Sequence, residues 1–287
     1  MNGTVIRAFA RQFARNKPGV AGIVIIIAFL VMALLAPWIS PYDPGQMNLL
    51  ARNKGPTIDH WFGNDEMGRD ILSRIIFGAR VSLLSAIGAV SIATLLGVPL
   101  GLLAGYVGGW TDSLIMRVMD VLLSFPAFLL ALGLAAAMEP GLVNAVLAVG
   151  IARTPQFVRM VRGLTLSARE RDFIQSARAI GVAESVIVSK HLLPNIMGPI
   201  VVQATLHVAT SILTITGLGF LGIGMDPRTP EWGAMLSSGF SYLRVAPHMS
   251  VFPGVFIVLA VLGFNLAGDA LRDALDPRMK RYLTANQ

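Results

Sequence analysis

Residues 165–195 read TLSARERDFIQSARAIGVAESVIVSKHLLPN, from Thr165 to Asn195, and form the longest polar interruption in the apolar second half of the chain. Charged side chains exclude this stretch from hydrocarbon: Arg169, Glu170, Arg171, Asp172, Arg178, Glu184 and Lys190. A narrow apolar stripe at helical spacing still predicts a short amphipathic helix, made by Phe173, Ile174, Ala177 and Ile180. Gly181 then predicts a glycine cap. A second short helix is expected through Val186, Ile187 and Leu192, ended by Pro194.

Two short helices joined at a glycine, within an otherwise apolar chain, are typical of a docking surface for a soluble partner. The alternative is an amphipathic segment that rests on the lipid surface. Both interpretations stay open at this point, because each predicts a helix with one apolar stripe and charged flanks.

The same stretch resembles the cytoplasmic loop of binding-protein-dependent ABC import permeases, and it is called the coupling loop (residues 165–195) below. The family pattern is EAA, three residues, Gly, nine residues and then I-x-L-P. The matching positions here are Gln175, Ser176, Ala177, Gly181, His191, Leu193 and Pro194. The spacing agrees, but Gln175, Ser176 and His191 depart from the consensus. The resemblance therefore implies no ion pair from a glutamate to an ATPase.

Four further segments resemble the dipeptide, oligopeptide and nickel permeases of that family. They are HWFGNDEMGRDILSRIIFGARVSL at 60–83, SFPAFLLAL from Ser124, GLGFLGIG from Gly217 and ALRDALDPRMK at 270–280. With the coupling loop they cover nearly the whole chain in order, which makes the resemblance far more specific than any single motif.

Composition places the chain among the polytopic membrane proteins. Hydrophobic residues make up 54% of the 287 residues and charged residues only 14%, and apolar runs of about 20 residues are long enough to span a bilayer. A net charge of +7 could indicate nucleic acid in a soluble protein. In a protein of the lipid membrane, an excess of basic residues is typical of the cytoplasmic loops. No nucleic-acid partner is therefore expected. The chain contains no cysteine, which excludes disulfides and thiol chemistry.

The pattern predicts an all-α fold with six transmembrane helices and a cytoplasmic two-helix coupling loop. The apolar runs lie at about 20–38, 81–106, 114–138, 141–158, 196–221 and 251–266. Residues 1–80 would hold the first span and an extracytoplasmic segment, residues 81–270 the importer domain, and residues 271–287 a cytoplasmic tail. Pro37 occupies the place of a signal cleavage site, so the first span is expected to stay uncleaved.

The distribution of charge predicts the orientation in a bacterial cytoplasmic (inner) membrane. The expected outer segments (40–80, Glu139 and 223–249) carry seven basic and eight acidic residues, whereas the rest of the chain carries 16 basic and eight acidic residues. Because basic loops stay in the cytoplasm, both termini and the coupling loop are expected there.

Two patterns of small residues predict close helix packing. One recurs every four positions in the second run, where small side chains let helix backbones approach in lipid: Ser85, Ala89, Ala93, Gly97, Gly101 and Gly105. The other is G-x-G-x-x-G at Gly217, Gly219 and Gly222. It ends an apolar run and follows no strand, so close packing or a bend is expected there, not a nucleotide site.

Neither a catalytic centre nor a metal or cofactor site is expected in this chain. Its four histidines form no ligand cluster: His60, His191, His207 and His248. No G-x-x-x-x-G-K-[ST] loop is present, so ATP and Mg would be used by partner subunits. Asp120 lies three residues after Arg117. A local ion pair explains that carboxylate more economically than a functional site.

The resemblance implies the permease subunit of an ATP-driven importer for dipeptides or short oligopeptides. Nickel or another small solute is the alternative substrate, and a self-contained channel or ion-coupled carrier is the alternative function. The implied partners are a second permease, two ATPase subunits and an extracytoplasmic solute-binding protein. The coupling residues would be Phe173, Ile174, Gln175, Ser176, Ala177, Ile180, Gly181, Leu193 and Pro194. Polar groups of the fifth span are candidates for lining the pathway: Gln203, Thr205, His207, Thr210, Ser211, Thr214 and Thr216.

Overall fold

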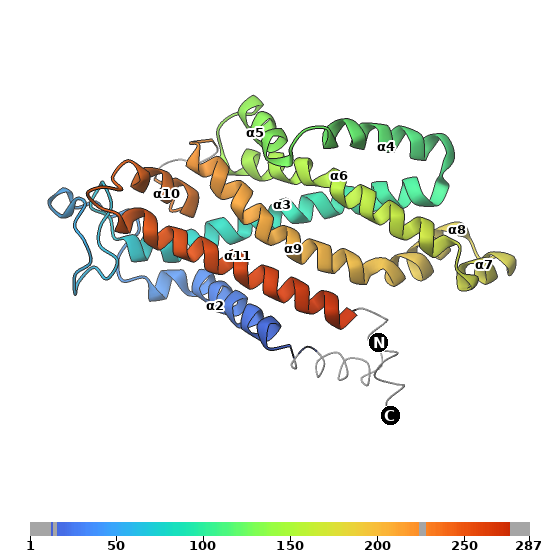
Figure 1. The fold of residues 1–287 in the computed structure, drawn as a ribbon, viewed down its shortest axis with the longest axis horizontal. Coiled ribbons are helices and arrows are strands. Elements are labelled where there is room, and N and C mark those ends of the chain that lie inside the picture. Colours follow the sequence, from blue (N-terminus) through green and yellow to red (C-terminus); the bar gives the residue numbers. More distant parts are fainter. Residues whose placement is uncertain (1–12, 14–15, 224–227, 276–287) are drawn as a thin grey trace.

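The computed structural model describes residue 13, residues 16–223 and residues 228–275, and over these residues the chain forms an elongated helical bundle (Figure 1). The described part contains no strand, only an isolated bridge between Asn64 and Asp70. The main helices are α2 (Lys17–Ile39), α3 (Ile71–Val107), α4 (Gly109–Leu123), α5 (Ala127–Ala137), α6 (Leu142–Arg169), α7 (Asp172–Ala179), α9 (Leu193–Phe220), α10 (Trp232–Phe240) and α11 (His248–Leu275). Short turns are η1 (Leu49–Ala51), α8 (Glu184–Val186) and the π-helical η2 (Ile187–Leu192).

The long helix α3 runs through the bundle and packs along α6. The predicted stripe of small residues is buried from Ser85 to Gly105, as expected. A methyl group added at Gly101 would come within 2.7 Å of the Val161 Cβ and 2.8 Å of the Val158 carbonyl oxygen. The two backbones are therefore in direct contact, as small residues permit in lipid.

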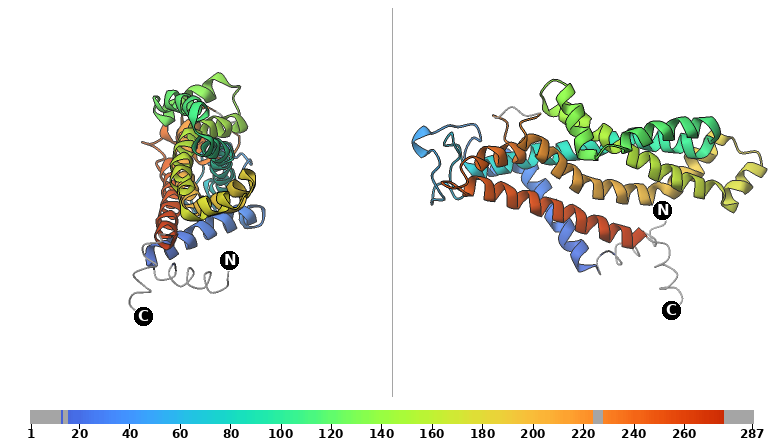
Figure 2. Two further views of the ribbon diagram at one scale, coloured as in Figure 1. Left: turned by 90° about the vertical axis from the view of Figure 1, so that its right-hand side faces the viewer. Right: turned by 45° about the horizontal axis from the view of Figure 1, so that its top comes forward.

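The first and last long helices lie side by side on one flank of α3 and α9. A Cβ at Gly22 of α2 would approach the backbone of α11 to 2.7 Å at the Ala267 nitrogen and 2.8 Å at the Gly263 oxygen. The Asn16 side chain donates to Asp273 at 3.4 Å, so the start of α2 lies beside the end of α11. Figure 2 places α4 and α5 on the opposite flank of the bundle.

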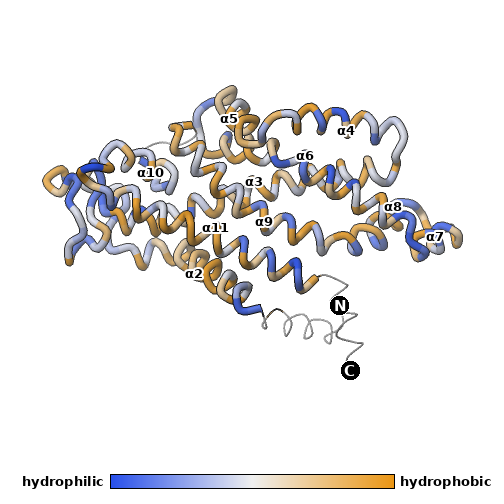
Figure 3. Tube along the Cα trace, in the orientation of Figure 1, coloured by the Kyte–Doolittle hydropathy of each residue, from blue (hydrophilic) through white to orange (hydrophobic). Residues whose placement is uncertain are grey.

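Hydrophobic residues predominate along the bundle, and hydrophilic residues are concentrated in the 40–70 segment, around α7 and α8, and in parts of α4 and α6 (Figure 3). Within the described residues, four helical segments are long and apolar enough to cross a membrane: Lys17–Ile39, Ile71–Val107, Glu184–Phe220 and His248–Leu275. The pair α4 and α5 would make a fifth span. The predicted count of six is therefore not reached on length and composition alone. The remaining long helix, α6, carries Arg153, Arg159 and Arg162 in its interior.

The predicted third span is not one straight helix. α4 and α5 meet at an angle of 89°, and the break falls at Ser124, Phe125 and Pro126. Pro126 has no backbone N–H to donate into a continuing helix, and its ring clashes with the preceding turn. The Ser124 hydroxyl instead donates to the Val121 carbonyl at 2.7 Å and closes α4.

The prediction that Pro194 ends the second loop helix is wrong. α8, η2 and α9 form one continuous helical segment, Glu184–Phe220, that passes through Pro194. The widened turns of η2 precede this proline, and the Leu193 N–H bonds to the Val188 carbonyl, five residues back. A π-helical turn re-pairs the backbone around the missing donor, so the helix continues.

Helix α10 lies at the end of the bundle opposite the coupling loop (Figure 1). Glu231, which caps the start of α10, joins this helix to Ser82 of α3 and lies against Gly219 of α9. Its side chain is fully buried. One carboxyl oxygen caps α10 by accepting from the Ala234 N–H at 2.8 Å, and the other accepts from the Ser82 hydroxyl at 3.3 Å. Burial raises the pKa of this carboxyl above its ordinary value, because desolvation penalises the charged form.

The glycines at the end of α9 pack closely, as predicted. A Cβ at Gly217 would lie 2.9 Å from the Phe128 ring of α5, and one at Gly219 would lie 2.5 Å from a Glu231 oxygen. Gly222 has a φ of +76° and ends the helix. The motif therefore serves helix packing and a helix cap.

Candidate functional site

The coupling loop begins inside α6, which continues to Arg169, and turns at Gly181 after α7. Gly181 has a φ of +80°, which confirms the predicted glycine cap. Its N–H bonds to the Arg178 carbonyl at 3.0 Å, and the Val182 N–H bonds to the Ala177 carbonyl at 3.1 Å. This pair of bonds defines a Schellman motif, in which the αL glycine satisfies the last carbonyls of the helix.

The predicted apolar stripe of α7 divides into a buried part and an exposed part. Ile174 and Ala177 are buried in a cluster with α6 and α9 that includes Val161, Ile187 and Ile196. Phe173 and Ile180 stay exposed, Ile180 at 80% of its surface. The inner residues hold the loop on the bundle, and the outer two present apolar surface at its tip.

The remaining predicted coupling residues lie around this turn. The Gln175 amide donates to the Arg169 carbonyl at 3.1 Å, so it caps the end of α6. Ser176 and Pro194 are exposed, and Leu193 is half-buried. Gln175 thus has a role within the chain that a consensus glutamate, with no side-chain N–H at neutral pH, could not fill.

Three polar side chains that the sequence analysis missed bind the loop to α3. Arg178 donates to Glu184 at 3.1 Å and to the Tyr106 hydroxyl at 3.2 Å. The Tyr106 hydroxyl also bonds to Glu184. The signal available in the sequence was the opposite charge of Arg178 and Glu184 on either side of Gly181.

Helix α4 is held to α6 by two ion pairs. Arg162 binds both carboxyl oxygens of Asp112, with Nη2 at 2.6 Å from Oδ2. Asp120 pairs with Arg159 at 2.6 Å. The predicted partner of Asp120, Arg117 in the same helix, is therefore wrong: the arginine of the neighbouring helix makes the contact, because α4 folds back along α6.

The predicted pathway residues of α9 differ in their exposure in the single chain. His207, Ser211, Thr214 and Thr216 are buried, Gln203 and Thr205 are half-buried, and Thr210 is exposed. Gln203 bonds to the His207 ring at 2.9 Å, and that ring lies 5.1 Å from the Phe157 ring of α6. Four of these residues, at 203, 207, 210 and 214, have the spacing of one helix face.

Arg153 of α6 reaches this face, and the sequence analysis missed it. Its Nη2 donates to the Thr214 hydroxyl at 3.1 Å and to the Thr210 carbonyl at 3.3 Å. The signal was present, because Arg153 is the only charged residue in the predicted span 141–158, and such residues mark functional sites by default.

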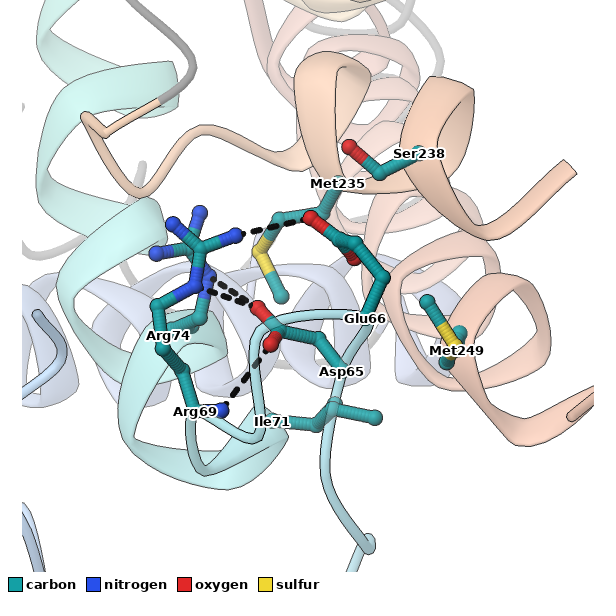
Figure 4. A pocket seen from close by; sticks show the side chains of 8 residues that line it. All are labelled: Asp65, Glu66, Arg69, Ile71, Arg74, Met235, Ser238 and Met249. Atoms are coloured by element: carbon teal, nitrogen blue, oxygen red, sulfur yellow. Dashed lines mark hydrogen bonds and ion pairs between the residues drawn. The ribbon is translucent and has the colours of Figure 1, made fainter. Parts of the chain in front are cut away.

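The end of the bundle opposite the coupling loop contains a buried charge cluster. It lies between the 40–70 segment, α3 and α10 (Figure 4). Arg69 binds Asp65 at 2.6 Å and Glu66 at 2.9 Å, and Arg74 approaches Asp65 at 3.4 Å. The cavity beside them has a volume of about 10 Å³, the size that holds one water molecule at most. This cluster fixes the 40–70 segment on the bundle, and its cavity leaves no room for a solute. In the described part of the chain, no group of histidine or acidic side chains could hold a metal ion.

Comparisons with known proteins identify the family of this chain. Residues 97–281 match the family described as "Binding-protein-dependent transport system inner membrane component", and residues 4–56 match the "N-terminal TM domain of oligopeptide transport permease C". The chain therefore belongs to the binding-protein-dependent permeases, the membrane subunits of ABC importers.

Two similar curated proteins are also permeases, and they are named for dipeptides and for glutathione. The chain is 46% identical over 270 residues to the dipeptide transport system permease protein DppC of Alkalihalophilus pseudofirmus, covering 94% of this chain and 89% of that protein. It is also 46% identical over 273 residues to the glutathione transport system permease protein GsiD of Escherichia coli, covering 95% and 90%. A solved structure of the MetNI methionine ABC transporter in an inward-facing conformation shares the fold. Its TM-score is 0.59 at 20% identity, over 72% of this chain and 98% of that chain.

Proposed function

We propose that this permease forms half of a translocation pathway for dipeptides or short oligopeptides, together with a second, similar permease. Its relatives of equal identity are named for dipeptides and for glutathione, and both of these solutes are small peptides. Nickel, the alternative substrate, has less support, because the described residues offer no cluster of metal ligands. An extracytoplasmic binding protein would select and deliver the solute.

The proposed topology has six crossings, with both termini and the coupling loop in the cytoplasm. α6 supplies the crossing that composition alone does not identify: its 28 residues span about 42 Å at about 1.5 Å per residue. Its arginines are tolerable there, because Arg159 and Arg162 pair with α4 and Arg153 bonds to α9. In Figure 1, α11 runs toward the side of the bundle that carries the coupling loop, and α2 begins beside the second half of α11.

The coupling loop would receive the movement of two separate ATPase subunits. Phe173 and Ile180 offer them exposed apolar contacts, while Ile174 and Ala177 fix α7 to the bundle. The loop continues through η2 into α9 without a break. Movement of the loop would therefore reach the proposed pathway helix directly and open the pore to alternate sides as a rigid-body change.

The observation that carries this proposal is the coupling loop itself, exposed at its tip and continuous with α9. The test is uptake of labelled dipeptides into proteoliposomes that contain both permeases, both ATPases and the binding protein. ATP-dependent accumulation is expected from the full complex, and no ATP hydrolysis from the purified chain alone. Turnover by the isolated chain, with contaminating ATPases excluded, would contradict the assignment.

A further inference from the structure

Arg153 is a positively charged, half-buried side chain in the middle of α6. It follows the first residue of α6, Leu142, by 11 positions, or about 17 Å at about 1.5 Å per residue. A depth of this size corresponds to the hydrocarbon core of a bilayer about 30 Å thick. An ionisable side chain at such a depth faces protein or a water-filled path, because exposure to lipid is too costly.

The positive charges of Arg159 and Arg162, in the same helix, are neutralised by ion pairs, but the charge of Arg153 is not. Arg159 and Arg162 each pair with an aspartate of α4. Among the described residues, no carboxylate lies within ion-pair distance of Arg153, and both of its hydrogen bonds come from Nη2. A guanidinium has five N–H donors. The Nε and Nη1 donors of Arg153 are therefore available to a further acceptor. The guanidinium groups of Arg159 and Arg162, by contrast, are already bound to aspartates of α4.

The surroundings of Arg153 are polar and partly open. It lies against the α9 face that carries Gln203, His207, Thr210 and Thr214, and Thr210 is exposed in the single chain. Phe157, one turn along α6 from Arg153, is fully buried against His207. Its ring fills the space between α6 and α9 on that side of Arg153. Where the structure describes the chain, the open side offers a positive charge and hydroxyl groups but no carboxylate, a pattern that complements an anionic group carrying oxygen acceptors.

We infer that Arg153 binds a carboxylate group of the transported solute within the membrane. The inference rests on the proposed function, and it adds the chemical group that the pathway recognises. A free peptide ends in a carboxylate, and charge-assisted hydrogen bonds from an arginine to a carboxylate are about twice as strong as neutral ones. The bonds to Thr210 and Thr214 hold the guanidinium toward α9, so that its free Nε and Nη1 donors are oriented before the solute arrives.

The test compares a carboxylate with its neutral counterpart. Uptake of the alanine dipeptide and of its C-terminal amide is measured in the reconstituted full complex, each at a concentration that saturates the binding protein. Arg153→Gln should lower the ratio of acid to amide transport about tenfold or more, the size expected for a lost charge-assisted hydrogen bond. Arg153→Lys keeps the charge and should restore part of the ratio.

Arg159→Gln is the matched control, because it removes an arginine of the same helix that already has an acidic partner. It should leave the ratio of acid to amide transport unchanged, whatever it does to total uptake. An unchanged ratio in Arg153→Gln would overturn the inference. Separation of the two permeases in that variant would overturn it too, because Arg153 would then pair with an acid of the second permease. If the unmodified complex takes up neither compound, the proposed substrate class fails instead.

Discussion

Gly181 shows how one residue can control the coupling loop through backbone geometry alone. Its φ is +80°, and a Cβ placed on it would meet no atom within 4 Å. Replacement by valine therefore adds no clash with a neighbour. It forces a β-branched residue into the left-handed region, which costs about 1–2 kcal/mol. Relaxing that strain would tilt α7 away from its buried position.

We expect Gly181→Val to reduce both substrate uptake and capture of the ATPase subunits, with normal insertion into the membrane. Gly181→Asn should be milder, because asparagine tolerates this conformation better. Gly163→Val is the matched control: Gly163 lies within helix α6 and also has open space around it. Uptake and pull-down are measured together. Wild-type values in Gly181→Val would show that the cap does not matter for coupling.

Glu231 makes a second prediction at the scale of one residue. Because burial raises the pKa of this carboxyl in the folded protein, the folded state binds the proton more tightly than the unfolded state. Its contribution to stability is complete below the ordinary carboxyl pKa and is lost as the pH rises through the raised value. The melting temperature of the wild-type protein should therefore fall over that interval.

Glu231→Gln should flatten that pH dependence, because the amide keeps the shape and carries no titrating proton. Melting temperatures in detergent between about pH 4.5 and 8, from the ordinary carboxyl pKa upward, provide the comparison. Glu139→Gln, an exposed residue, should retain the wild-type slope. Parallel slopes for wild type and Glu231→Gln would contradict the prediction.

At the scale of the element, the contact between α3 and α6 depends on glycine. Gly101→Ala places a methyl group 2.7 Å from the Val161 Cβ. Overpacking of this kind costs about 1–3 kcal/mol. We expect a lower melting temperature in detergent. Gly133→Ala in α5, where no atom lies within 4 Å, should leave stability unchanged or raise it, since alanine favours helix.

Some elements could be predicted from the sequence and others could not, for physical reasons. The stripe from Ser85 to Gly105 has a fixed spacing, so its burial was predictable. The continuation of the helix through Pro194 was not, because a π-helical turn has no sequence signature that distinguishes it from an α-helical end. The partner of Asp120 depends on how α4 folds back on α6, and that is information about distant residues.

Within the candidate site, too, some features could be predicted from the sequence and others could not. The Gly181 cap follows from local backbone preference, and it was predicted. The division of the α7 stripe into buried Ile174 and exposed Ile180 follows from packing against α6 and α9. Arg153 was missed because hydropathy averages over a whole run, in which one arginine hardly changes the mean.

At the scale of the whole molecule, the orientation can be tested with single cysteines, since the chain has none of its own. Lys54, Ser176 and Ser241 are exposed and occupy opposite ends of the bundle, with Ser176 in the coupling loop. In intact cells, a membrane-impermeant maleimide should label Lys54→Cys and Ser241→Cys. Ser176→Cys should react only after permeabilisation. Labelling of Ser176→Cys in intact cells would reverse the topology.

The pairing of α2 with α11 has a consequence for how the protein is made. The ribosome delivers α2 to the membrane first and α11 last, yet the backbone at Gly22 fits against the backbone at Gly263 and Ala267. During synthesis the first helix must therefore wait in lipid with a bare glycine surface until the final segment arrives. A chain that stops before α11 would keep that surface uncovered.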